Sequence, residues 1–279
     1  ADLNKIAAMM VGTYTGGSVN LVAMSDAFGA SGDMVSSSVV ADNLLMALYF
    51  FVLIAIPTIK FFLKKFKHPY IDEVKASGEG ENQAASYWKA KPVALIDIAE
   101  ALAIAFAIVA ISTAIADFFA ELIPTSNFGL ALLNGLLGNK YLIMPTLTML
   151  LPTIKPEFMG NIGGAQEIGT FLIHIFFAVI GVPASIYLIM TQAPLLLVFC
   201  AIIVGMNMIF SFVFGKIFKF NLEEICIASN ANVGGPTTAA ALAIAKGWQA
   251  MVVPALLVGT LGYVIGNYYG IFVGTFLGR

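Results

Sequence analysis

Two apolar segments, each broken by a glycine pair, constrain the fold of this chain most. Residues 13–20 read TYTGGSVN, and residues 229–238 read SNANVGGPTT. When the two glycine pairs are aligned without a gap, Ala23, Ala27 and Gly29 coincide with Ala241, Ala245 and Gly247. Paired broken helices in the two halves of a membrane protein indicate the binding site of a secondary transporter. The sequence therefore predicts two structural repeats.

The composition predicts a membrane protein. Of the 279 residues, 59% are hydrophobic and only 11% are charged, whereas soluble domains carry roughly a quarter charged residues. We therefore expect an all-α polytopic membrane protein that contacts membrane lipids along several spans. The net charge is −2 and no basic stripe is present, so we expect no nucleic-acid partner.

Runs of about twenty apolar residues predict the spans. Residues 1–66 are interpreted as the C-terminal part of repeat one, residues 67–92 as a cytoplasmic linker, and residues 93–279 as repeat two. The expected elements cover residues 35–62, 93–122, 130–151, 167–190, 193–214, the broken element 222–246, and 250–277. Repeat one is incomplete in this interpretation, so missing N-terminal helices are expected partners. We expect the first broken segment to pack on another copy of the chain or on helices outside this sequence, or else to be bare toward lipid.

Whether the two repeats are parallel or inverted depends on whether the broken elements cross the membrane. Lysines directly before and within the linker, from Lys60 to Lys91, place it in the cytoplasm. If the second broken element is a re-entrant hairpin, the repeats are inverted, and if it crosses the membrane fully, they are parallel. A third alternative is that the element at residues 130–151 does not span, which permits inversion with a crossing broken helix. Because inverted repeats are frequent in secondary transporters, we favour the hairpin.

The glycine motifs resemble a family. The stretch NVGGPTTAAA at residues 232–241, followed by GTLGY at residues 259–263, is similar to the YjcL-like family of uncharacterised bacterial membrane proteins. GTYTGGSVN at residues 12–20 resembles its first-repeat motif, and EIGT at residues 167–170 with IGVPAS at residues 180–185 also resembles it. More distantly, the layout is similar to sodium/glutamate and citrate symporters and to the bile-acid and proton antiporter folds. The resemblance implies inverted repeats, secondary transport across the bacterial inner (plasma) membrane and a homodimer, and it names no substrate.

Polar side chains around the two breaks are the predicted ligands of a solute or ion. Unwound backbone inside a bilayer must line a cavity or be buried in protein, and helix N-termini there direct amide dipoles at anionic groups. The alternative is that the glycines only permit close helix packing. The candidate residues are Thr15, Gly16, Gly17, Ser18, Asn20, Asn230, Asn232, Gly234, Gly235, Pro236, Thr237 and Thr238. We further expect Asn232 and Thr237 to face the same cavity as Thr15 and Asn20.

Four ionisable residues are candidates for coupling to a cation. Asp42 lies inside the first long span, where an acid is costly and functional by default, although a hydrogen-bonded structural acid is the alternative. Asp97 and Glu100 share a helical face, and they could be interfacial instead. His174 lies within a span and could titrate near neutrality, or it could be a neutral packing residue.

These features predict a cation-coupled secondary transporter, with Na⁺ or H⁺ as coupling ion and a small polar or anionic solute as cargo. The alternative is a membrane sensor or partner-binding scaffold that does not transport. The sequence contains no P-loop, no His-Glu-x-x-His and no Gly-x-Ser-x-Gly, so we expect no enzyme. Two histidines and two cysteines, both expected to be buried free thiols, predict no metal site and no cofactor beyond a bound Na⁺.

A run of glycines in the last predicted span is interpreted separately. Gly262, Gly266, Gly270 and Gly274 recur every four residues and therefore share one helical face. Small residues at this spacing let membrane helices approach closely. The pattern predicts a packing stripe.

Overall fold

The computed structural model describes residues 3–77, 92–124, 126, 128–165, 167–169, 171–172, 175 and 194–278. Every regular element among these residues is helical. The helices are α1 (Leu3–Gly16), α2 (Val19–Ala27), α3 (Gly32–Ala55), η1 (Ile56–Thr58), α4 (Lys60–Lys65), α5 (Pro69–Ser77), α7 (Leu95–Leu122), α8 (Phe128–Leu137), α9 (Lys140–Ile154), α10 (Pro156–Gly160), α13 (Pro194–Ile217), α14 (Leu222–Ala245), η2 (Gln249–Met251) and α15 (Val252–Leu277).

These bounds agree with most of the predicted spans. Four segments of the described chain are long and apolar enough to cross a membrane, namely Gly32–Thr58, Leu95–Leu122, Pro194–Ile217 and Gln249–Leu277. The predicted element at residues 130–151 is two helices, α8 and α9, because Asn139 caps a new helix by accepting a hydrogen bond from the Tyr141 N–H. The predicted span at residues 167–190 lies largely outside the described residues.

The first broken segment folds back on itself. α1 and α2 meet at Gly17, whose φ of 109° is a conformation that glycine adopts readily. A side-chain carbon added at Gly12 would lie 3.0 Å from Met24 Cγ, and the Lys5 ammonium donates to the Gly29 carbonyl. Residues before the break therefore pair with residues after it in antiparallel order. We call residues 3–27 hairpin 1.

The second broken segment, α14, also reverses direction. Gly235 has φ 79° and ψ −172°, which interrupts the helix immediately before Pro236. The Asn230 side chain donates to the Thr238 carbonyl at 2.9 Å, whereas residues eight apart in a straight helix are separated by about 12 Å. The chain must therefore fold back at the glycine. We call residues 222–245 hairpin 2.

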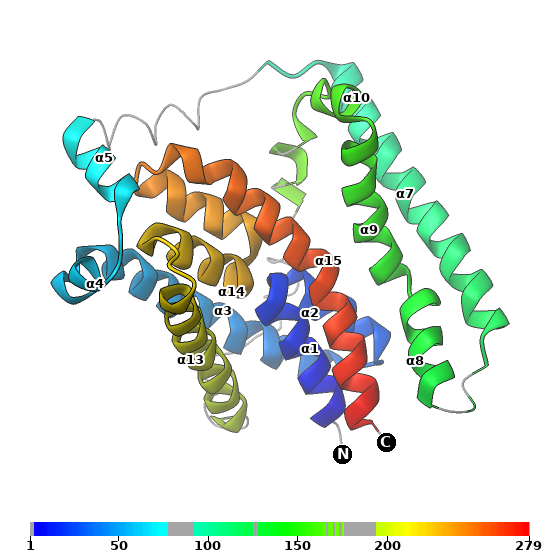
Figure 1. The fold of residues 1–279 in the computed structure, drawn as a ribbon. Coiled ribbons are helices and arrows are strands. Elements are labelled where there is room, and N and C mark those ends of the chain that lie inside the picture. Colours follow the sequence, from blue (N-terminus) through cyan, green and yellow to red (C-terminus); the bar gives the residue numbers. More distant parts are fainter. Residues whose placement is uncertain are drawn as a thin grey trace.

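Two long helices flank the hairpins at the centre of the molecule. α15 lies against hairpin 1 and hairpin 2 along most of its length, and α3 contacts both hairpins more sparsely. Figure 1 shows α1 and α2 beside α15, with α14 and α3 next to them. The buried hydrophobic core is formed mainly by the two hairpins with α3, α13 and α15.

A second group of helices lies to one side of this centre. α7, α8, α9 and α10 pack on one another, and the group joins the rest through contacts of α8 and α9 with α15 (Figure 1). The Asn267 side chain donates to the Tyr141 carbonyl at 2.8 Å across this junction. One face of α15 thus packs on the hairpins and another on this side layer.

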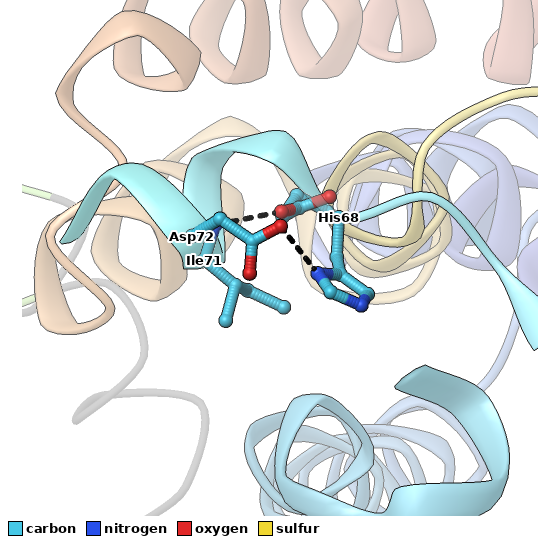
Figure 2. Close-up of polar contacts among 4 residues, drawn as sticks. His68, Ile71 and Asp72 are labelled. Atoms are coloured by element: carbon cyan, nitrogen blue, oxygen red, sulfur yellow. Dashed lines mark hydrogen bonds and ion pairs between the residues drawn. The ribbon is translucent and has the colours of Figure 1, made fainter. Parts of the chain in front are cut away.

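The short helix α5 is fixed to the start of hairpin 2. The Ile71 N–H in its first turn donates to the Glu223 carboxylate at 2.8 Å, and the Leu222 N–H donates to the Lys67 carbonyl at 2.8 Å. Figure 2 shows this end of α5, where His68 Nδ1 lies 3.0 Å from Asp72 Oδ2. A carboxylate at a helix N-terminus satisfies a free amide and complements the helix dipole. The first part of the predicted linker (residues 67–92) is therefore helical and tied to hairpin 2.

The expectation of a bare first segment is wrong. Residues 4–25 are all buried or half-buried, and they pack mainly on α15, hairpin 2 and α13 of the same chain. The polar side chains of Thr13, Ser18 and Asn20 are each at most 6% exposed. Hairpin 1 is sheltered because the glycine face of α15 admits its backbone.

Candidate functional site

The tips of the two hairpins touch each other. A side-chain carbon added at Gly17 would lie 3.0 Å from Gly235 Cα, and one added at Gly235 would lie 2.8 Å from the Gly16 carbonyl oxygen. Only residues without a side chain allow two backbones to come so close. The two glycine pairs recognised in the sequence therefore form a single junction in space.

A buried amide bridges each hairpin just behind its tip. The repeats are offset by 218 residues (235 − 17), so Asn20 corresponds to Thr238 and Gly12 to Asn230. The Asn20 amide donates to the Gly12 carbonyl at 3.2 Å, and the Asn230 amide donates to the Thr238 carbonyl at 2.9 Å. The same two positions are thus bridged in both hairpins, with the donor on opposite arms. This relation supports the sequence repeat.

The predicted glycine stripe of α15 packs closely on hairpin 1, and Gly259, which precedes the stripe, packs on hairpin 2. Added carbons at Gly262 and Gly270 would lie 2.6 Å from the Thr15 carbonyl oxygen and 3.1 Å from the Ala8 carbonyl oxygen of hairpin 1. One added at Gly259 would lie 2.4 Å from Pro236 Cα of hairpin 2. From its N-terminal to its C-terminal part, α15 therefore contacts first the tip of hairpin 2, then the tip of hairpin 1, and finally the base of hairpin 1.

Asp42 lies directly behind the tip of hairpin 1. Its side chain is fully buried on α3, inside the candidate span Gly32–Thr58. The Ser18 hydroxyl donates to Asp42 Oδ2 at 2.6 Å and the Thr13 hydroxyl donates to the same oxygen at 3.2 Å. Because Thr13 and Ser18 flank the break at Gly17, the carboxyl group connects both arms of the hairpin to α3.

The second carboxyl oxygen of Asp42 has a different environment. Asp42 Oδ1 is buried and makes no hydrogen bond within the described part of the chain, and the buried hydroxyl of Tyr14 makes none either. Tyr14 and Cys200 are close enough to interact electrostatically with Asp42, and the Cys200 thiol in turn contacts the Met10 sulfur at 3.3 Å. One carboxyl oxygen is thus bound by hydroxyls, whereas the other has no hydrogen-bond partner among the described residues.

The predicted ligands at the breaks lie in varied environments. Asn20 is buried and also donates to the Gly262 carbonyl at 3.3 Å, which fixes it structurally. The hydroxyls of Thr15 and Thr238 donate to carbonyls of their own segments, Val11 at 2.7 Å and Gly235 at 3.1 Å. In contrast, Asn232 is half-buried and Thr237 is exposed beside Pro236. These last two side chains are the most accessible of the predicted set.

The other predicted coupling residues are not at the junction. Asp97 and Glu100 are half-buried in the first two turns of α7, which belongs to the side layer. The Asp97 carboxylate accepts a hydrogen bond from the Ala94 N–H at 2.8 Å, which is a helix-capping contact. His174 lies outside the described residues. Among the residues that the structure describes, no group of three or more His, Cys, Asp or Glu could hold a metal ion.

Several residues at the centre were not recognised as site candidates in the sequence. Thr13 and Tyr14 precede the first glycine pair and line Asp42, and a polar pair next to a break inside an apolar segment is a usable signal. A second cluster joins three helices, since Ser229 donates to Asn207 Oδ1 at 2.8 Å and Tyr49 contacts both. Such contacts between distant segments leave no local pattern in a sequence.

The fold and the site define an all-helical membrane protein built around two hairpins whose tips meet. The chain belongs to the family described as protein of unknown function (DUF819), whose model matches residues 1–279. It is 50% identical over 272 residues to the uncharacterized membrane protein YjcL of Bacillus subtilis (strain 168), an alignment that covers 98% of this chain and 67% of that protein. The resemblance to the YjcL-like family is therefore confirmed. No solved structure matches the chain.

Proposed function

We propose that this protein is a cation-coupled secondary transporter of a small polar or anionic solute, embedded in the bacterial inner membrane. The observation that carries the proposal is the contact between Gly17 and Gly235 at the tips of the two hairpins. Gly262, which packs on the same junction, lies near the middle of the candidate span Gln249–Leu277. Broken helices that meet at mid-membrane are the usual framework of a solute site in such transporters.

The order of contacts along the long helices supports inverted repeats. α15 starts next to hairpin 2, passes the tips at Gly262 and ends beside the base of hairpin 1. α3 starts after hairpin 1, contacts its tip through Asp42, and reaches the first arm of hairpin 2 through the hydrogen bond between Tyr49 and Ser229. The two helices therefore pass the hairpins in opposite order, as inverted repeats require.

The chemistry at the tips suits a polar or anionic cargo. Each second arm begins a helix at the junction, at Val19 in hairpin 1 and at Pro236 in hairpin 2. Helix N-termini present free amides and a partial positive charge. The accessible Thr237 and Asn232 add hydrogen-bonding groups beside the second of these N-termini. Polar groups at membrane depth are tolerated where they line a cavity.

The tight glycine packing also fits the alternative function. Because α15 contacts the backbone of both hairpins without intervening side chains, the centre could be a rigid scaffold for a sensor or a partner-binding protein. A scaffold needs no movement at the junction and no exchange of solute. Solute exchange across a membrane, which can be measured directly, therefore distinguishes the two functions.

Counterflow in liposomes tests the proposal. The purified protein is reconstituted into vesicles preloaded with one unlabelled metabolite at a time from a panel of small carboxylates, amino acids and polar neutral solutes. We expect at least one radiolabelled solute to accumulate more in these vesicles than in protein-free vesicles, and its uptake to depend on Na⁺ or on pH. If a folded, monodisperse protein exchanges no member of the panel, the transporter is contradicted and the scaffold is favoured.

A further inference from the structure

The carboxyl group of Asp42 is fully buried on α3. It lies within a candidate membrane span, and none of its interactions is with a cationic side chain of the described residues. An isolated carboxylate in an apolar interior costs several kcal/mol, so such a group must be paired, neutralised or used. Its second oxygen, Oδ1, is fully buried and has no hydrogen-bond partner within the described part of the chain.

We propose that Asp42 binds the coupling ion and that this ion is a proton. The inference rests on the proposed function and names its coupling chemistry. Proton binding converts the carboxylate into a neutral carboxylic acid, with water as the proton source and no other group transferred. Asp42 Oδ1 is the oxygen left to carry this proton, because Oδ2 already accepts hydrogen bonds from Ser18 and Thr13.

The surroundings of the Asp42 carboxyl group favour a proton over sodium. Hard cations take several oxygen ligands, whereas sulfur is a ligand for soft metals. Besides Ser18 and Thr13, the groups that interact with Asp42 are the phenol of Tyr14 and the thiol of Cys200, and the Cys200 thiol contacts the Met10 sulfur. A carboxylic acid needs only one acceptor for its hydrogen, and the Tyr14 hydroxyl can provide it.

Both protonation states of Asp42 are supported by the same contacts. Hydroxyl groups both donate and accept hydrogen bonds, so Ser18 and Thr13 can stabilise the ionised form and remain bonded to the neutral form. The N-terminus of α2 also favours a negative charge beside Ser18. The titratable groups facing Asp42 are Tyr14 of α1 and Cys200 of α13, and in the described chain no charged group of α2 or α14 interacts with it.

The two hydroxyl donors link the proton to the junction of the hairpins. Thr13 belongs to the last turn of α1, and Ser18 directly precedes α2. Loss of the carboxylate charge weakens the hydrogen bonds from Thr13 and Ser18 together, because hydrogen bonds to charged groups are about twice as strong as neutral ones. In this proposal the turn at Gly17, which contacts Gly235, adopts one arrangement when Asp42 is ionised and another when it is protonated.

Infrared difference spectroscopy of the reconstituted protein between acid and alkaline pH tests the proposal. We expect the carbonyl band of a buried carboxylic acid to appear at low pH in wild type, to be lost in Asp42→Asn, and to persist in Asp33→Asn. Asp33 provides the matched control because it is an exposed acid in the first turn of the same helix. Asp42→Glu keeps an acid and should move the band, which assigns it even if Asp42→Asn folds poorly.

Three outcomes decide the question. Absence of any band that responds to Asp42→Asn or Asp42→Glu overturns the proton site. A melting temperature that rises in NaCl but not in choline chloride, with the rise lost in Asp42→Asn, overturns the proton in favour of sodium. A band that titrates in a protein that exchanges no solute upholds the proton site and overturns only the transport function.

Discussion

The backbones of Gly262 and Thr15 are in direct contact, so that a methyl group on Gly262 would lie 2.6 Å from the Thr15 carbonyl oxygen. Through this contact the backbone of hairpin 1 packs directly on α15. A residue with a side chain at this position must push the hairpin away, because backbone atoms cannot rotate aside as side chains can. The packing of hairpin 1 on α15 therefore depends on glycine at position 262.

Gly262→Ala is predicted to destabilise the protein. Overpacking costs about 1–3 kcal/mol, which should lower the melting temperature in detergent by several degrees. Gly205→Ala on α13 is the control, because no atom lies within 4 Å of the added carbon there. We expect this control to be neutral or stabilising, since alanine favours helix over glycine. Equal melting temperatures for the two variants would refute the close contact.

Gly17→Ala is predicted to be the more damaging of two glycine substitutions at positive φ. At Gly17 the φ of 109° is unfavourable for alanine, and the added carbon would also meet Gly235 at 3.0 Å. Gly29 has φ 58° with nothing within 4 Å, so Gly29→Ala has only the conformational cost of about 1–2 kcal/mol. The difference between their melting temperatures reports the tip contact together with the greater backbone strain of alanine at φ 109°. A smaller loss for Gly17→Ala would mean that the hairpin tips do not touch.

The positions of the breaks could be predicted from sequence because their cause is local. A glycine pair within an apolar run permits a turn wherever it occurs, and the same signal at residues 16–17 and 234–235 indicated two related elements. The helix limits of α7, α13 and α15 followed from apolar length for the same reason. These features depend on neighbouring residues rather than on the fold.

Other features could not be predicted because their cause is tertiary. The pairing of Asp42 with Ser18 and Thr13 depends on how α3 passes the hairpin, and the sequence showed only that an acid lay in a span. Glu223 at the start of α14 accepts a hydrogen bond from an amide more than 150 residues away, and no local pattern in the sequence indicates that partner. The sheltering of hairpin 1 was mispredicted because the glycine face of α15 was not linked to it.

Glu223→Ala is predicted to release α5 from hairpin 2. The Ile71 N–H would lose the Glu223 carboxylate as its acceptor, and a buried amide left without a partner costs about 1–3 kcal/mol. Hydrogen exchange at the first turn of α5 should then accelerate by roughly one to two orders of magnitude, because local opening controls exchange. Glu73→Ala, an exposed site on the same helix, is the control and should leave exchange unchanged. Unchanged exchange in Glu223→Ala would contradict the docking.

The most direct test of the central claim is water access to the junction of the hairpins in the membrane. Thr237→Cys places a thiol on an exposed side chain beside Pro236, and Leu257→Cys places one on an apolar residue of α15 that is 65% exposed. The native Cys200 and Cys226 are fully buried and give the background. A solute transporter predicts that a membrane-impermeant methanethiosulfonate reagent labels Thr237→Cys in liposomes and leaves Leu257→Cys unlabelled. Labelling of neither cysteine would show a dry junction and contradict the account.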